Sequence, residues 1–270
     1  MHPMALTVCV LGLAVPAMAS AETVRLHAAG SLKAALSEAG RAFEAKNAGV
    51  NVEPNFAASG LLCERIESGE TAHVFASADV GHPTKLVDAG RSQTKVAIFA
   101  RNQLCALVRE ELKVAPATLL DTMLDTSVRV GTSTPKADPS GDYAFAQFAK
   151  AEKQNSGART TLESKALQLT GGPTSEKAPD GKNLYGWVMA SGRADVFLTY
   201  CTNAALAQKD VPTLQIVQIP PELNVAADYG LIVLKHAPPA AEAFAQFILG
   251  DEGQTILVKY GFGRGDGALR

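Results

Sequence analysis

Hydroxyl side chains recur in this sequence where an expected β-strand gives way to a loop or helix. Ligands in open α/β sheets bind beyond the carboxyl ends of strands, so this placement indicates a ligand site. Hydroxyl groups and the free N–H groups of helix starts donate hydrogen bonds without carrying formal charge, which suits an anion. The residues concerned are Ser31, Ser59, Ser140 and Tyr200.

The stretch His27-Ala28-Ala29-Gly30-Ser31-Leu32 illustrates the arrangement. It closes a strand expected over residues 23–27 and leads into a helix expected over residues 32–46. Small residues let a ligand approach the backbone, and Ser31 stands where an N-cap belongs. An ordinary capped strand–helix turn would have the same sequence, and Ser31 can serve both roles.

Motifs for metal binding or catalysis are missing. There is no H-x-x-x-H or C-x-x-C pair, and no P-loop, G-x-S-x-G or G-x-G-x-x-G follows a strand. Asp79 and Asp195 are isolated carboxylates, which we interpret as cap or turn residues. We therefore expect no catalytic residue, no resident metal and no cofactor. A secreted enzyme using Cys201 or a carboxylate is a weaker alternative.

Composition sets the class of protein. The chain has 270 residues, of which 47% are hydrophobic, so it can form a large core or two lobes. The net charge of −2 and the 6% aromatic content argue against nucleic-acid binding and against attachment to a membrane surface.

Residues 1–21 resemble an export signal peptide. An uncharged apolar core covers residues 5–16, and Ala19-Ser20-Ala21 is a small-x-small cleavage site. The core is too short for a transmembrane helix, although the first four residues lack the usual Lys or Arg. We expect cleavage after Ala21 and a soluble periplasmic protein.

Three cysteines follow the expected cleavage site, namely Cys63, Cys105 and Cys201. An odd number in an oxidising compartment allows one bridge and one thiol, or three buried thiols. A Cys63–Cys105 bridge and free buried cysteines are given equal weight.

The remaining chain alternates strand-like and helix-like segments. This βα plan predicts an α/β fold with a parallel or mixed sheet covered by helices. Two strands are expected at residues 96–100 and 104–108, a loop at 168–182, and a tail at 261–270 that is ordered only at its start.

An ordered set of motifs resembles the periplasmic molybdate-binding proteins of bacterial molybdate ABC importers. The set covers residues 23–263 and comprises Ala28-Ala29-Gly30-Ser31-Leu32, Phe56-Ala57-Ala58-Ser59-Gly60, Val74-Phe75-Ala76-Ser77-Ala78-Asp79, Pro139-Ser140-Gly141, Ser191-Gly192-Arg193-Ala194-Asp195 and Lys259-Tyr260-Gly261-Phe262. Gly30, the residues Cys201-Thr202-Asn203 and a long loop at 170–182 depart from the family pattern.

The resemblance implies a type II periplasmic-binding-protein fold with two lobes, each a mixed sheet flanked by helices. Lobe one would comprise residues 22–101 and 226–270, lobe two residues 102–225, and a hinge would lie near residues 101 and 225. The implied ligand groups are the hydroxyl and N–H groups of Ser31 and Ser59, the N–H groups at Ser140 and near Lys182, and the Tyr200 hydroxyl.

The implied function is capture of molybdate, and of the similar tungstate, for an ABC permease in the inner membrane by a monomeric receptor. These tetrahedral dianions offer only acceptors, and a shell of donors satisfies them. A protonated anion such as hydrogen phosphate would need an acceptor, and none is expected among the five residues. Sulfate, thiosulfate or a small organic anion is the alternative ligand.

Overall fold

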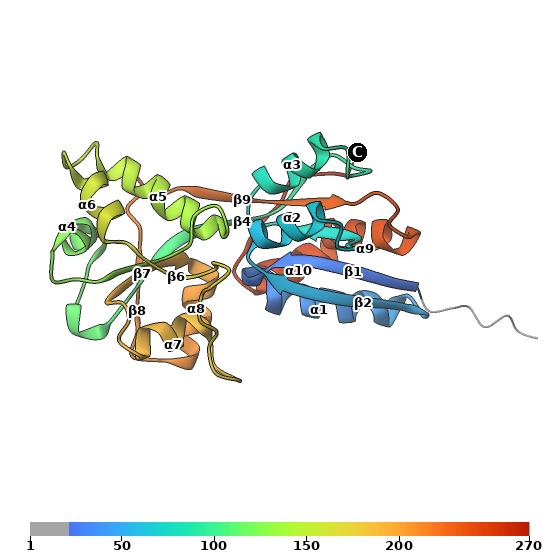
Figure 1. Cartoon of the computed structure of the whole chain (residues 1–270). Helices are drawn as coiled ribbons and strands as arrows, with labels where there is room; N and C mark the ends of the chain where they lie inside the picture. The colour runs from blue at the N-terminus through green and yellow to red at the C-terminus, as the bar shows by residue number, and fades with distance from the viewer. Residues whose placement is uncertain (1–21, 270) are drawn as a thin grey trace, which may run out of the picture.

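The computed structural model describes residues 22–269, so the expected signal peptide lies outside the described residues. Figure 1 shows two lobes joined by the long strands β4 (Ala97–Val108) and β9 (Ala226–Val233). Each lobe has a mixed sheet with helices on both faces, which confirms the predicted fold class. No helix within residues 22–269 is long and apolar enough to cross a membrane.

Lobe one is built on strands in the order β2-β1-β3-β9-β4. The first three are parallel, and β9 is antiparallel to both β3 and β4. Their bounds are β1 (Glu22–Ala29), β2 (Val50–Ala57) and β3 (Val74–Ala76). Side chains of β3 alternate between faces: Val74 and Ala76 join one buried cluster and Phe75 joins another.

Both faces of this sheet are therefore covered. Helices α1 (Lys33–Lys46), α9 (Pro239–Leu249) and α10 (Asp251–Lys259) pack together on one face. Helices α2 (Ser59–Glu67) and α3 (Gly81–Asp88) pack together on the other.

Lobe two continues the sheet in the order β4-β7-β5-β6, with β8 also pairing to β4. The strands are β5 (Val130–Ser133), β6 (Leu167–Thr170), β7 (Val196–Tyr200) and β8 (Gln215–Gln218). The covering helices are α4 (Leu119–Leu124), α5 (Pro139–Ala151), α6 (Ala158–Lys165), α7 (Leu184–Ala190) and α8 (Cys201–Asp210).

Strand β4 belongs to both lobes. Its residues 97–103 pair with β9, and residues 104–108 pair with β7 and β8. The expectation of two separate strands here is wrong, because pairing is continuous through the polar residues Arg101, Asn102 and Gln103. The residue limits given above for the two lobes remain a prediction.

The C-terminal tail packs against β4 further than expected. Strand β10 (Gly263–Arg264) pairs with β4, and the Gly267 N–H donates to the Ile98 carbonyl at 2.8 Å. The glycines allow this approach, since a Cβ at Gly267 would lie 2.3 Å from the Ile98 nitrogen.

Candidate functional site

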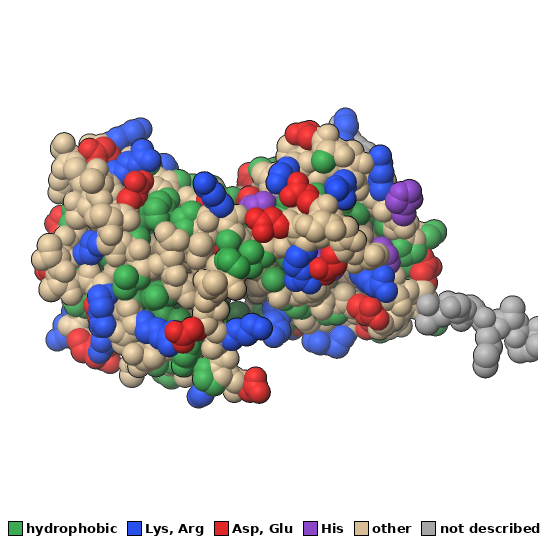
Figure 2. All heavy atoms as spheres, in the orientation of Figure 1, with side chains coloured by type: hydrophobic (Ala, Val, Ile, Leu, Met, Phe, Trp, Pro, Cys, Tyr) green, Lys and Arg blue, Asp and Glu red, His purple; other side chains and the backbone are tan. Residues whose placement is uncertain are grey.

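A cleft of about 840 Å³ lies between the lobes, and Figure 2 shows the molecule hollowed there. Four of the five predicted site residues line it: Ser31, Ser59, Lys182 and Tyr200. Cationic side chains also line it, on α1 from lobe one and on the loop before α7 from lobe two. They are Lys33, Arg41, Lys177 and Lys182, and they favour an anionic ligand.

Ser31 lies in a short 3-10 turn, Gly30–Leu32, that precedes α1. Its expected role as the N-cap of this helix is wrong, because α1 begins at Lys33 and Leu32 holds the cap position. The Ser31 hydroxyl instead lies 3.1 Å from the hydroxyl of Tyr229 on β9. Tyr229 also accepts from Asn102 Nδ2 at 3.3 Å. Ser31 is thus held by the strands that join the lobes.

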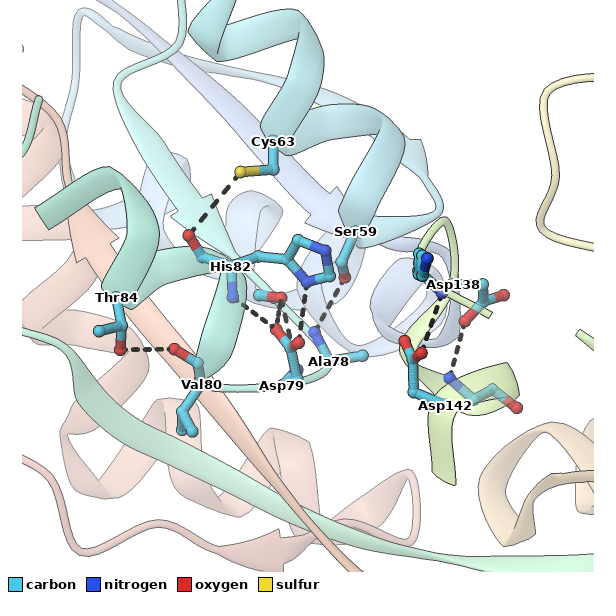
Figure 3. A network of polar contacts seen from close by, with 12 residues as sticks. Ser59, Cys63, Ala78, Asp79, Val80, His82, Thr84, Asp138 and Asp142 are labelled. Atoms are coloured by element: carbon cyan, nitrogen blue, oxygen red, sulfur yellow. Dashed lines mark hydrogen bonds and ion pairs between the residues drawn. The ribbon is translucent and has the colours of Figure 1, made fainter. Parts of the chain in front are cut away.

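Ser59 is the first residue of α2, and its side chain is fully buried. Its hydroxyl accepts a hydrogen bond from the Ala78 N–H at 3.0 Å, a contact drawn in Figure 3. This bond holds the start of α2 against the end of β3. Ser59 and Leu61, in the first turn of α2, line the same wall of the cleft, and the start of a helix favours an anion.

Ser140 sits beneath the cleft surface instead of lining it. Its N–H, the predicted ligand donor, donates to Asp138 Oδ1 at 3.0 Å, and Asp138 is the N-cap of α5. The buried Ser140 hydroxyl has no partner among the described residues. The group that reaches the cleft here is the Asp138 side chain.

Lys182 lies at the mouth of the cleft with an exposed side chain. Its N–H donates to the Pro179 carbonyl at 3.1 Å within a turn. The next residue, Asn183, caps α7 by accepting from the Gly186 N–H at 3.0 Å. The feature of Lys182 that faces a ligand is therefore its positive charge at the mouth.

Tyr200 ends β7 and is buried. Its hydroxyl donates to the Ala78 carbonyl of lobe one at 3.2 Å. Its ring centroid lies 5.4 Å from that of Tyr229. Burial raises the pKa of Tyr200 well above its ordinary value, so the hydroxyl keeps its proton and remains a donor.

A second contact between the lobes lies beside Ser59. The Gly60 N–H donates to the Ala137 carbonyl at 2.8 Å. A Cβ at Gly60 would lie 2.2 Å from the Lys136 carbonyl oxygen, so only glycine permits this approach. Together with the Tyr200–Ala78 bond, it brings the lobes together along one side of the cleft.

Sequence reasoning missed Asp138, Tyr229 and Gly60. The D-P at the start of α5 identifies an N-cap and proline pair, which was a usable sign for Asp138. Tyr229 gave no such sign, because it lies inside an ordinary apolar strand and meets Ser31 only through the fold.

Cys105 and Cys201 form a disulfide, so the Cys63–Cys105 bridge weighed above is wrong. Cys105 lies on β4 and Cys201 begins α8, directly after Tyr200. Their Cα atoms are 4.8 Å apart. Cys63 is a buried thiol whose pKa burial raises to about 11. The Cys201 side chain is thus cross-linked and cannot serve as a free nucleophile.

Asp79 lies one residue before Val80, which holds the N-cap position of α3, and its Oδ1 accepts from the His82 N–H at 3.2 Å. It also has a partner that the sequence did not reveal, because Oδ2 lies 2.8 Å from His82 Nδ1. Asp195 is paired as well: its Oδ1 lies 2.6 Å from Arg129 Nη2. The described residues contain no cluster of three or more His, Cys, Asp or Glu side chains that could hold a metal.

Two α/β lobes that share their long strands and enclose a cleft between them define a solute receptor. The chain belongs to the family described as bacterial extracellular solute-binding protein, whose sequence model matches residues 24–263. One relative in this family, YvgL of Bacillus subtilis, is named a putative ABC transporter substrate-binding lipoprotein and is 24% identical over 241 residues, which cover 89% of this chain and 86% of the relative. A permease is therefore the expected class of partner.

Three similar proteins illustrate the relationship. The uncharacterized protein PM1146 of Pasteurella multocida is 38% identical over 184 residues, which cover 67% of this chain and 75% of the relative. The molybdate-binding protein ModA of Mycobacterium bovis is 27% identical over 246 residues, covering 90% and 85%. The structure of the sulfate-binding protein SubI of Mycobacterium tuberculosis has a TM-score of 0.73 at 21% identity, covering 91% and 88%, and supports the fold.

Proposed function

We propose that the protein captures a tetrahedral oxyanion, molybdate and with it tungstate, outside the cytoplasm and delivers it to the permease of an ABC importer. The supporting observation is the convergence of uncharged hydroxyl donors from both lobes, Ser31, Ser59 and Tyr200, on one cleft. Ser31 and Ser59 are each held in place by a neighbouring group before the anion arrives. The Tyr200 hydroxyl donates its single proton to the Ala78 carbonyl, and it would turn from that carbonyl to the anion.

Helix starts and rim charges add favourable electrostatics. The N-termini of α2 and α8 begin at this cleft, next to Ser59 and Tyr200. Helix N-termini carry partial positive charge and favour anions by about 0.3–1 kcal/mol each, or up to about 2 kcal/mol when partly buried. The lysines at the mouth would speed the approach of an anion and make the association rate fall with salt.

The similarity to ModA supports molybdate as the first ligand to test. Another anion of the same charge, such as sulfate or thiosulfate, or a small organic anion, is the second candidate. The size of the cleft supports an organic anion as a candidate ligand, because a volume of about 840 Å³ falls in the range of pockets for organic ligands, roughly 300–1,000 Å³. Periplasmic location after removal of residues 1–21, and a monomeric state, belong to the same proposal.

A thermal-shift screen tests it with molybdate, tungstate, sulfate, thiosulfate and phosphate. A ligand that binds only the folded chain stabilises it by RT ln(1 + [L]/Kd). We expect shifts with molybdate and tungstate and a 1:1 stoichiometry by titration. A shift with another anion alone would reassign the ligand. Ser31→Ala and Ser59→Ala should each weaken binding by about 1.5–3 kcal/mol, the value of a hydrogen bond to a charged group.

A further inference from the structure

An acidic side chain lies in this cationic cleft. Asp138 is partly exposed and lines the same cavity as Ser59 and Tyr200. Its Oδ1 is engaged as the N-cap of α5 by the Ser140 N–H, and Figure 3 shows Asp138 on the lobe-two side, across from Ser59. The set of donors predicted from the sequence contained no such acceptor.

The second oxygen, Oδ2, lies against Gly171, which also lines the cleft. A Cβ at Gly171 would lie 2.5 Å from Oδ2 and from the Asp138 Cβ. Gly171 has a φ of +76°, a conformation that glycine adopts without strain. The loop therefore approaches the carboxyl group closely, and no side chain of residue 171 covers it.

Within residues 22–269 no cationic side chain forms an ion pair with this carboxylate. The titratable groups that act on Asp138 are the carboxylate of Asp142 on α5, the imidazole of His82 on α3, and the phenols of Tyr185, Tyr200 and Tyr229. Burial raises its pKa to about 6. An ionised Asp138 would repel a dianion bound between Ser59 and Tyr200, and a proton removes that repulsion.

We propose, on the basis of the oxyanion function above, that Asp138 is a direct ligand of the bound anion and that one proton lies between Asp138 Oδ2 and an anion oxygen. Molybdate, tungstate and sulfate bring no proton, so one is taken from solvent: Asp138–COO⁻, H⁺ and the dianion give Asp138–COOH hydrogen-bonded to the dianion. Hydrogen phosphate brings its own proton, and Asp138 then accepts it without uptake. Oδ1 continues to accept from the Ser140 N–H in either case.

Calorimetric titration with molybdate, sulfate and phosphate at pH 7.5, in two buffers of different ionisation enthalpy, tests this directly. We expect close to one proton taken up per molybdate or sulfate, and close to none per hydrogen phosphate. The Kd for molybdate and sulfate should rise about tenfold per pH unit above pH 6.5, as linkage to one proton requires. In Asp138→Asn, an amide that still caps α5, binding of both dianions should not vary with pH.

Asp142→Asn is the matched control, because Asp142 is a half-buried carboxylate on the same helix and does not line the cleft. Asp142→Asn should keep the wild-type proton uptake. This result would assign the uptake to Asp138 and not to Asp142. Dianion binding by the wild-type chain without proton uptake would overturn the proposal, as would an unchanged pH profile in Asp138→Asn. Absence of binding by any of the three anions would instead reject the oxyanion function itself.

Discussion

The hydroxyl oxygens of Ser31 and Tyr229 lie 3.1 Å apart, joining the turn before α1 to the strand β9 that passes between the lobes. Tyr229 is fully buried, and its hydroxyl also meets Asn102 on β4. The cleft wall of lobe one is therefore hydrogen-bonded to both joining strands.

Tyr229→Phe should weaken anion binding, because it removes the group that orients Ser31. We expect up to about a tenfold increase in Kd and about 0.5–1.5 kcal/mol less stability, the usual value of one neutral hydrogen bond. Titration with molybdate and urea unfolding measure the two effects. Tyr143→Phe is the control, since the Tyr143 ring packs 6.3 Å from that of Tyr200 and no hydrogen bond acts on its hydroxyl within residues 22–269. If Ser31→Ala and Tyr229→Phe add without coupling in a double-mutant cycle, the pair does not act as a unit.

Gly60→Ala should impair closure of the lobes. Its Cβ would lie 2.2 Å from the Lys136 carbonyl and 2.7 Å from that of Ala137, and neither backbone atom can move aside cheaply. Affinity falls with the fraction of binding-competent closed state, and we expect at least about a tenfold loss.

Small-angle scattering with saturating anion should then give a larger radius of gyration than for the wild type. Gly40→Ala is the control. Gly40 lies inside α1, and a Cβ there would make an ordinary 3.5 Å contact with the Val52 side chain on β2. The unfolding midpoint should not fall in Gly40→Ala, since alanine favours helices over glycine. In Gly60→Ala it should fall, because the clash also breaks the hydrogen bond from Gly60 to Ala137. Wild-type affinity in Gly60→Ala would show that this contact is not needed.

Reduction of the Cys105–Cys201 bond should destabilise the protein. The bond closes a separation of 96 residues, and loss of a native disulfide typically costs about 2–5 kcal/mol. Urea midpoints with and without dithiothreitol, and for Cys105→Ser, measure the loss. Cys63→Ala should keep its dependence on dithiothreitol. Rapid alkylation of native Cys63 near neutral pH would contradict its burial and raised pKa.

Glu70→Gln should lower stability at neutral pH and have no effect near pH 2. Hydrogen bonds from Arg65, and then from His27, lower the Glu70 pKa from 4.5 to about 2. The ionised form is favoured in the folded state, so this stabilisation is full above pH 4.5 and is lost as the pH falls to about 2. Partial exposure limits it to at most about 1 kcal/mol. Equal unfolding curves for both chains at pH 7 would contradict the prediction.

The sequence was sufficient to predict the alternation of strands and helices. Apolar periodicity marks β1, β2 and β9 clearly, and glycine ends α2 and α3. It failed where local pattern is weak: α6 has the polar sequence ARTTLESK, and α8 starts at Cys201 with no side-chain cap. Both helices are stabilised by tertiary packing, which the local sequence pattern does not reveal.

The site was predictable only as far as its positions follow strand ends. Ser31, Ser59 and Tyr200 meet that condition, and the structure brings them to one cleft. The Ser31–Tyr229 bond spans 198 residues, and the Gly60–Ala137 contact joins two loops. Contacts between residues so far apart in sequence depend on how the lobes pack against each other. The residue spacing within one segment of the sequence does not predict that packing.

The cross-link between Cys105 and Cys201 also bears on how the receptor matures. Cys201 directly follows Tyr200, so the cleft wall of lobe two and the covalent bond to β4 form at neighbouring residues. Disulfides persist in oxidising compartments and are rare in the cytosol. The bond between β4 and the start of α8 therefore forms only after a newly made chain meets an oxidant, and the proposed ligand site beside it would reach its final covalent state at the same step.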